Sequence, residues 1–222
     1  MERIKKMKAV KKTDDEKVKE KTLKLPKTAT KSLKGSETKS LKSAETKKLG
    51  VSPTRAKKIK HSYQVKDAEN SLLLKLKDGE VVIEMYPESA PKHVERIKEL
   101  VRAGFYNGLK FHRVIEGFMA QTGCPYGNGT GGSGKKLKAE FNTRPHKRGT
   151  VSMARSMMPD SADSQFFICF ADCDWLNGQY TVWGEVTSGM EHVDNIKKGA
   201  GQNGSVANPD EIISMEVIAD IS

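Results

Sequence analysis

Short strand-like segments separated by turns fill most of the chain after residue 70, and this pattern limits the possible folds more than any other feature. The run SLLLKLK, then Asp78-Gly79, then EVVIEMYP predicts a hairpin, because Asp-Gly suits a two-residue turn between antiparallel strands. Further strands are predicted in LKFHRVI, GFMAQTG, TVSMARS, QFFICFA, YTVWGEV and IISMEVIADI. These segments are short and bounded by turn residues, as strands are.

Two helices are predicted, one early and one late in this region. The first has Ser89 as its N-cap, Pro91 in its first turn and apolar residues on one face. The second is indicated by Ser188 and Glu191, which have the spacing of a capping box. About eight strands with two helices predict a mainly β fold, a closed eight-stranded antiparallel β-barrel capped by two α-helices.

Residues 1–60, which we call the tail, differ from the rest of the chain in charge. They contain 21 Lys and Arg and 7 Asp and Glu, against 39 and 28 in the whole chain, so the net charge of +11 comes from the tail. The tail also repeats KSLKGSET as KSLKSAET and has no aromatic residue. Low hydrophobicity with high net charge predicts disorder. We therefore expect a lysine-rich disordered tail over residues 1–60 and one folded domain over residues 61–222.

The charge of the tail allows two interpretations. One is a solvated extension that keeps the protein soluble. The other is weak electrostatic contact with RNA, the ribosome or an anionic membrane. The absence of aromatic residues argues against base stacking, so sequence-selective reading of RNA is not expected.

The three cysteines, Cys124, Cys169 and Cys173, form no C-x-x-C pair and have no histidine at zinc-ligand spacing. The sequence therefore predicts no metal site, disulfide framework or other cofactor. An odd number of cysteines fits a reducing cytoplasm, where we expect the protein to act. The basic N-terminus runs into acidic residues, so no secretion signal is expected, and no apolar run is long enough for a membrane span.

Both faces of the predicted strands carry large apolar side chains. In QFFICFA, Phe166 and Phe167 point to opposite faces, and a barrel interior can take only one of them. If Phe166 lies inside, Phe167 lies outside together with Met119, Gln121 and Arg113. Such an apolar patch with a few donors suits an apolar ligand that has carbonyl groups. The alternative is that these side chains only pack under a loop.

Four longer segments follow one another along the chain: FHRVIEGFMAQTGCPYGNGTGG, GTVSMARS, DSQFFICFADCDWLNGQYTVWGEV and SGMEHVDNI. In order and spacing they match the motifs of the cyclophilin type of peptidyl-prolyl cis/trans isomerase, which the chain closely resembles in a bacterial-like form. The resemblance covers nearly all of residues 65–220 and none of the tail. It implies an isomerase that rotates X-Pro bonds in folding or flexible polypeptides, with a chaperone role in protein folding. The resemblance also implies cyclosporin binding, because Trp175 stands at a position where family members that bind cyclosporin well have tryptophan.

The resemblance also implies a set of site residues. Arg113 would be the catalytic cation, with Gln121 and Phe118 beside it. The other implied positions hold the proline ring or line the peptide groove: Met119, Gly129, Thr130, Ala154, Arg155, Gln165, Phe167, Trp175, Leu176 and Tyr180. Two of these depart from many eukaryotic relatives, since Tyr180 replaces a histidine and Arg155 replaces an asparagine.

The implied reaction suits these side chains. Rotation about an X-Pro bond has a barrier of about 18 to 20 kcal/mol, because amide resonance must be broken. At the twisted transition state the nitrogen gains a localised lone pair, which the permanently charged guanidinium of Arg113 can stabilise. No bond is cut and no proton is transferred, so no acid or base is required.

Two other functions remain open. A proline-binding adaptor on the same fold needs no cation, and the presence of Arg113, Gln121 and Phe167 together favours the enzyme. A second possibility is that the tail carries the main function and the domain is its cargo. For the enzyme, we expect a monomer that acts on proline-containing peptides and on unfolded or flexible proteins.

Overall fold

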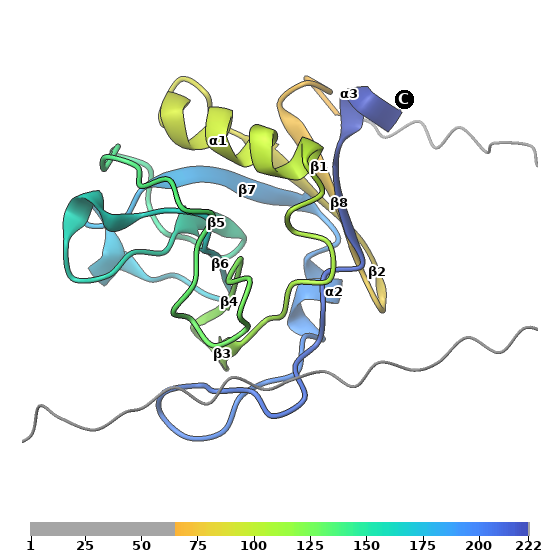
Figure 1. Ribbon diagram of the computed structural model, residues 1–222, viewed down its shortest axis with the longest axis vertical. Coiled ribbons are helices and arrows are strands. Elements are labelled where there is room, and N and C mark those ends of the chain that lie inside the picture. The colour runs from red at the N-terminus through yellow and green to blue at the C-terminus, as the bar shows by residue number, and fades with distance from the viewer. Residues whose placement is uncertain (1–64, 222) are drawn as a thin grey trace, which may run out of the picture. The chain divides into compact units, whose positions relative to one another are not determined.

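The computed structural model describes residues 65–221, which contain one sheet of eight antiparallel strands (Figure 1). The tail lies outside the described residues, and so do residues 61–64 and 222. The strands are β1 (Ser71–Leu76), β2 (Gly79–Met85), β3 (Arg113–Ile115), β4 (Met119–Thr122), β5 (Thr150–Met153), β6 (Phe166–Cys169), β7 (Val182–Ser188) and β8 (Ser214–Val217). Each of the eight predicted strand segments overlaps one of them, and most of the observed strands are shorter than predicted.

The sheet is curled and open, so the predicted closed barrel is wrong. Its strand order is β3-β4-β6-β5-β7-β2-β1-β8, and the two end strands do not pair with each other. The outer edge of β3 is instead occupied by a turn: Val114 N–H donates to the carbonyl of Gly204, and Val114 carbonyl accepts from Gly199 N–H. Because this turn satisfies the edge of β3, β8 has no free partner there. Only isolated bridges, such as Lys110 with Glu211, link the two ends.

Helices cover the ends of the curled sheet (Figure 1). The three α-helices within residues 65–221 are α1 (Pro91–Arg102), α2 (Met190–Asp194) and α3 (Ile218–Ile221), and the two short 3-10 helices are η1 (Pro159–Ser161) and η2 (Asp174–Leu176). None of these helices is long and apolar enough to cross a membrane. The helices α1 and α2 confirm the two predicted helices, whereas α3 replaces the end of a predicted strand.

The N-terminus of α1 is capped differently from the prediction. Ala90 is the N-cap residue and Ser89 lies outside the helix, although Pro91 takes the first position as predicted. The carboxylate of Glu140 accepts hydrogen bonds of 3.0 Å from the backbone N–H groups of Lys92 and His93. Glu140, from a distant loop, thus caps the helix in place of the predicted Ser89.

The capping box predicted for α2 is also wrong. Gly189 is the N-cap residue, with a φ of 83°, and no side chain caps the helix. A Cβ atom at Gly189 would lie 2.2 Å from the carbonyl oxygen of Glu80, so only glycine fits between the helix and β2. The close approach of two backbones, and not a serine cap, therefore fixes where α2 begins.

Two apolar clusters lie on opposite faces of β6, as the alternation predicted. Phe166 and Ile168 belong to the main core inside the curled sheet, which α1 closes. Phe167 and Cys169 belong to a smaller cluster on the outer face, together with Met119. The second cluster is the one that positions the candidate site.

Candidate active site

A row of side chains crosses β3, β4, β6 and β5 on the outer face of the sheet. Arg113 lies opposite Gln121 in the antiparallel register. Gln121 in turn lies opposite Phe167, and Phe167 lies opposite Ser152. Directly opposed residues have Cβ atoms about 5 Å apart. The strand register alone therefore brings a cation, an amide and an aromatic ring together.

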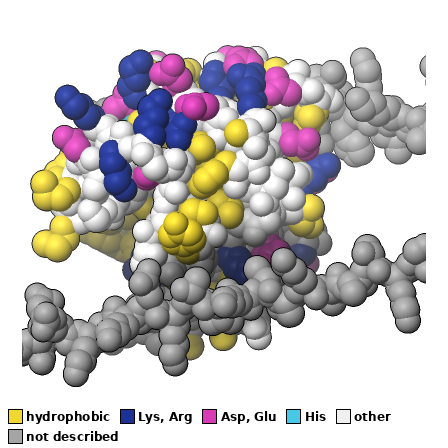
Figure 2. Space-filling view, in the orientation of Figure 1, with side chains coloured by type: hydrophobic (Ala, Val, Ile, Leu, Met, Phe, Trp, Pro, Cys, Tyr) yellow, Lys and Arg dark blue, Asp and Glu magenta, His cyan; other side chains and the backbone are white. Residues whose placement is uncertain are grey.

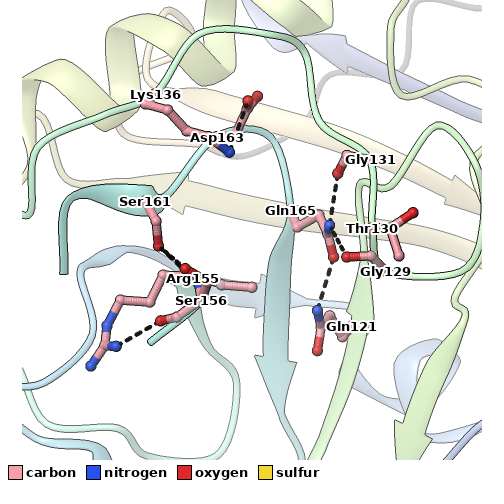
Figure 3. Close-up of a pocket in the computed structure, with 11 residues that line it drawn as sticks. Gln121, Gly129, Thr130, Gly131, Lys136, Arg155, Ser156, Ser161, Asp163 and Gln165 are labelled. Carbon is pink, nitrogen blue, oxygen red and sulfur yellow. Dashed lines mark hydrogen bonds and ion pairs between the residues drawn. The ribbon is translucent and has the colours of Figure 1, made fainter. Parts of the chain in front are cut away.

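Hydrogen bonds fix the direction of each polar group in this row. The amide nitrogen of Gln165 donates to the carbonyls of Gly129 and Gly131, both at 2.8 Å (Figure 3). Its oxygen therefore faces Gln121, whose Nε2 donates to it at 3.0 Å. The remaining oxygen of Gln121 accepts from Arg113 Nη1 at 3.2 Å. Two carbonyls of a loop thus set the orientation of the guanidinium through two amides.

A second acceptor holds the same guanidinium from another segment. Arg113 Nε donates to the carbonyl of Asn203 at 3.0 Å, and Arg113 Nη1 lies 3.9 Å from Met119 Sδ. The side chain is half-buried and within the described residues has no carboxylate partner. The carbonyl of Asn203 and the amide oxygen of Gln121 therefore orient the guanidinium without neutralising its charge.

The guanidinium borders a small cavity of about 90 Å³. The cavity is lined by Arg113, Phe118, Met119, Gln121, Ala154, Arg155, Phe167, Leu176 and Tyr180. Met119 and Phe167 are only 1% and 5% exposed, because Leu176 and Tyr180 belong to the same cluster and pack beside them. The outward apolar residues are thus the floor of a pocket and not an open patch.

A larger cavity of about 280 Å³ adjoins the first, since the two share Gln121, Ala154 and Arg155 (Figure 3). Its remaining lining residues are Gly129, Thr130, Gly131, Lys136, Ser156, Ser161, Asp163 and Gln165. Asp163 accepts hydrogen bonds from the backbone and hydroxyl of Ser133, and its carboxylate lies 3.6 Å from Lys136 Nζ.

Arg155 contacts other groups than Arg113 does. Its Nε and Nη2 donate to the carbonyl of Gln179 at 3.0 and 2.9 Å. Its guanidinium carbon lies 4.5 Å from the centre of the Tyr180 ring. That ring meets Phe167 edge-on at 5.8 Å. Arg155 therefore fixes Tyr180 as a wall of the small cavity, while its charge is directed at backbone carbonyls.

Of the residues named from the sequence, all but one line one of the two cavities. Trp175 lines neither. It is 61% exposed and its ring centre lies 5.6 Å from that of Phe118, so it stands on the outer rim of the small cavity. Gly129 and Thr130 are exposed and lie at the larger cavity.

His146, which no sequence pattern marks, lies behind the small cavity. Its ring stacks on Phe167 at 6.2 Å and meets Tyr180 edge-on at 6.4 Å. One ring nitrogen lies 2.9 Å from Ser152 Oγ and the other 3.1 Å from Asn177 Oδ1. Burial holds the pKa of His146 below its usual value, although the bond to Asn177 opposes this. The ring is thus a neutral support for the cavity wall.

The arrangement can bind a small apolar ring and place a fixed positive charge beside it. Within residues 65–221 there is no cluster of His, Cys, Asp or Glu that could hold a metal ion. The groups that line the small cavity include neither a carboxylate nor a histidine. Its chemistry is therefore electrostatic, through orientation and charge, and not acid–base.

Comparisons with known proteins agree with this geometry. The family model of the cyclophilin type peptidyl-prolyl cis-trans isomerase matches residues 71–217. A probable peptidyl-prolyl cis-trans isomerase of Brucella suis is 58% identical over 167 residues, which cover 69% of this chain and 85% of that protein. Peptidyl-prolyl cis-trans isomerase B of Bacillus subtilis is 47% identical over 127 residues, covering 56% and 88%.

Solved structures give the same result. The cyclophilin AquaCyp293 from Hirschia baltica has a TM-score of 0.63 and 27% identity, covering 70% of this chain and 76% of that one. A Cryptosporidium parvum cyclophilin type peptidyl-prolyl cis-trans isomerase, crystallised in the presence of the dipeptide Ala-Pro, has a TM-score of 0.61 and 26% identity. The alignment covers 66% of this chain and 98% of that structure.

Proposed function

The chain belongs to the cyclophilin-type peptidyl-prolyl cis-trans isomerase family, and from this premise we propose that the proline ring of its substrate occupies the small cavity beside Arg113. The protein is a peptidyl-prolyl isomerase, so its substrates contain an X-Pro bond. The observation that supports this placement is the guanidinium of Arg113 at the edge of a small cavity whose floor is formed by Met119 and Phe167. In a bound proline the apolar ring would lie in the cavity and the amide nitrogen, which is part of that ring, would lie beside the guanidinium.

The cavity holds one side of the bond while the other side turns. Met119, Phe167 and Leu176 offer apolar contacts to the pyrrolidine ring but no hydrogen bond. The peptide unit on the amino side of proline then rotates against the fixed ring. As resonance is lost, the nitrogen becomes pyramidal, and Arg113 donates to the lone pair that forms.

The fixed direction of Arg113 matters for the rate. Because Gln121 and the carbonyl of Asn203 already orient the guanidinium, it needs no reorganisation when the transition state forms. A rate increase on the order of 10⁵ requires about 7 kcal/mol of transition-state stabilisation. A charged donor in a partly dry site, together with a pocket that favours the twisted bond, can supply a term of this size.

The depth of the site limits the substrates. The floor at Met119 and Phe167 is nearly fully buried, so the proline must enter past Tyr180 and Leu176. A proline within a rigid folded surface cannot do this. We therefore propose that the enzyme acts, as a monomer in the cytoplasm, on unfolded or flexible polypeptides and assists their folding.

Replacing Arg113 with alanine tests the mechanism. We expect kcat/KM for a short X-Pro peptide, measured by NMR exchange or a protease-coupled assay, to fall about 100-fold or more. The core stays intact because Arg113 packs at the rim, so the thermal unfolding midpoint should change little. The matched control is Arg102→Ala, which removes an equal charge from the exposed ion pairs with Glu69 and Asp220.

The two variants separate catalysis from general charge effects. If Arg113→Ala keeps near-wild-type kcat/KM, Arg113 is not the transition-state donor. If Arg102→Ala loses as much activity as Arg113→Ala, the loss reflects net charge and the proposed role also fails.

A further inference from the structure

Two adjacent methionines stand almost fully in solvent close to the site. Met157 is 95% exposed and Met158 is 68% exposed, in the segment between β5 and β6. Figure 2 shows hydrophobic side chains projecting at the left edge of the described part, where Figure 1 draws this segment. Single exposed apolar residues are common, but a contiguous apolar group next to a binding groove often marks a contact surface.

Polar bonds, and not apolar packing, hold this segment in place. Ser161 Oγ accepts from the backbone N–H of Ser156 at 2.9 Å and donates to the carbonyl of Met158 at 2.5 Å. Arg155 Nη1 donates to the carbonyl of Ser156 at 2.9 Å. The turn is thus built without the two methionine side chains. Most of the surface of both side chains therefore remains free to contact another molecule.

Arg155 links the backbone of the exposed methionines to the wall of the small cavity. The guanidinium of Arg155 lies over the rings of both Tyr180 and Phe141, at 4.5 and 5.9 Å. Phe141 is itself exposed, and Arg155 also approaches the carbonyl of Met157 at 3.4 Å. We call Phe141, Met157 and Met158 the methionine surface.

The larger cavity connects this surface to Arg113. Ser156 and Ser161, which precede and follow the methionines, line that cavity, and Gln121 lines its opposite end. A polypeptide with its proline in the small cavity and its flanking residues in the larger one would therefore reach the methionine surface within a few residues. Because the methionine surface adjoins the larger cavity, the molecule expected to contact it is the same polypeptide substrate that fills the two cavities.

We propose that the methionine surface binds apolar side chains of the substrate polypeptide, a few residues from the X-Pro bond. The inference rests on the proposed function, because it assumes that the substrate crosses both cavities. Methionine is flexible and polarisable, so a pair of methionines adapts to different apolar side chains without selecting one of them. The enzyme then favours prolines that lie in apolar segments, which unfolded chains expose and folded proteins bury.

Two cations lie near the methionine surface, and each has contacts within the protein. The guanidinium of Arg155 is already engaged by the carbonyls of Gln179 and Ser156. Lys136 is paired with Asp163 at the other side of the larger cavity. Both cations are thus oriented by groups of the protein, and the methionine surface itself consists of three exposed apolar side chains, so apolar contact is the chemistry that these side chains offer.

Peptides of matched length test the proposal. A blocked four-residue peptide with a central Ala-Pro serves as the core, and longer versions carry three leucines or three serines on the amino side or on the carboxyl side. Turnover is measured by NMR exchange and affinity by titration calorimetry. The proteins are the full chain, Met157→Ser with Met158→Ser, Met157→Leu with Met158→Leu, and the control Ile213→Ser, which alters an exposed apolar residue outside both cavities.

The wild type should prefer leucine over serine on one side of the core by about tenfold in kcat/KM and in affinity. The double serine variant should reduce this preference to less than about twofold while turning over the short peptide normally. The double leucine variant and Ile213→Ser should keep the preference. An unfolding scan shows that the variants are folded.

The proposal is overturned if the wild type shows no leucine preference, or if the double serine variant keeps it. Loss of the preference in Ile213→Ser would also overturn it. A wild type that fails to turn over the short peptide would refute the proposed function instead. In that case the calorimetric affinities still decide whether the methionine surface binds apolar side chains.

Discussion

At the scale of single residues, the site combines groups that follow from strand alternation with groups that do not. Arg113, Gln121 and Phe167 lie at neighbouring register positions, so their shared face could be predicted from alternation and their roles from the family resemblance. The carbonyl of Asn203 and the ring of His146 come from turns far away in the chain. No periodic signal marks such residues, because only the tertiary fold brings them to the site.

Removing the ring of His146 should weaken the site without removing any group that lines the cavity. We expect His146→Ala to lower kcat/KM for a short X-Pro peptide about tenfold, since Phe167 and Tyr180 lose the ring that supports them. The cavity left behind should also lower the free energy of unfolding by about 2 kcal/mol or more. Peptide turnover and urea unfolding are the two measurements.

The control for this change is His192→Ala, which removes a partly exposed histidine near Glu191 at α2. It should leave turnover unchanged. Normal turnover in His146→Ala, despite lower stability, would show that the ring supports the fold but not the cavity wall.

At the scale of elements, local sequence predicted which segments form but not how their ends are fixed. The alternation in β6 correctly separated Phe166, inside the core, from Phe167 at the site. The N-terminus of α1, by contrast, is capped by Glu140, which lies 48 residues from Lys92. A cap from a distant loop leaves no trace in the sequence around the helix, so the local pattern wrongly predicts Ser89 as the N-cap.

Glu140 also connects α1 to the region of the site, which makes it a test of element stability. Its carboxylate caps α1 and lies 2.6 Å from His93 Nδ1, and its backbone N–H donates to Thr181 Oγ1 at 3.0 Å. Glu140→Gln keeps the shape but removes the charge. We expect a loss of about 1 to 2 kcal/mol in the free energy of unfolding at pH 7, measured with urea.

The matched control is Glu95→Gln, on the exposed face of the same helix, where Lys92 is the one ion-pair partner of the carboxylate among residues 65–221. That change should cost less than about 0.5 kcal/mol. Equal losses in the two variants would show that Glu140 contributes no more than a surface charge.

At the scale of the whole molecule, the number and direction of the strands could be predicted, but closure of the sheet could not. Closure depends on what occupies the edge of β3, and there the turn that contains Gly199 and Gly204 satisfies Val114. Turns of this kind are defined by long-range hydrogen bonds and not by periodicity. The sequence pattern for a curled open sheet is therefore the same as that for a barrel.

Three buried histidines should make the whole domain less stable in mild acid. Burial lowers the pKa of His93, His112 and His146 below the ordinary value of 6.5. Below pH 6.5 the unfolded chain therefore binds more protons than the folded one, and stability falls as the pH falls. Each unit of pKa difference corresponds to about 1.4 kcal/mol. Urea unfolding at pH 7.5, 6.0 and 5.0 measures this dependence.

The carboxylates do not account for a decline in that range. The hydrogen bonds that Glu140 accepts from His93 and Lys92 outweigh the effect of its burial and keep its pKa below 4.5, so its contribution is lost only at lower pH. His93→Gln should therefore flatten part of the decline between pH 6.5 and 5. Constant stability over this range in the wild type would contradict the expected direction for all three histidines.

The charge of the chain is divided between the tail and the rest, and this division predicts salt-dependent binding to polyanions. The tail carries 21 of the 39 basic residues but only 7 of the 28 acidic ones. Each phosphate contact releases a counterion, so the affinity for single-stranded RNA should fall steeply as salt rises, with a logarithmic slope of about −0.7 per contact. We expect the full chain to bind a fluorescent polyuridine at about 50 mM salt and to release it near 300 mM, whereas a chain starting at His61 should not bind at either.

Turnover of a short X-Pro peptide is the control, and it should be equal in both chains. RNA binding that survives high salt, or that persists without residues 1–60, would show that the charge of the tail is not what binds the RNA.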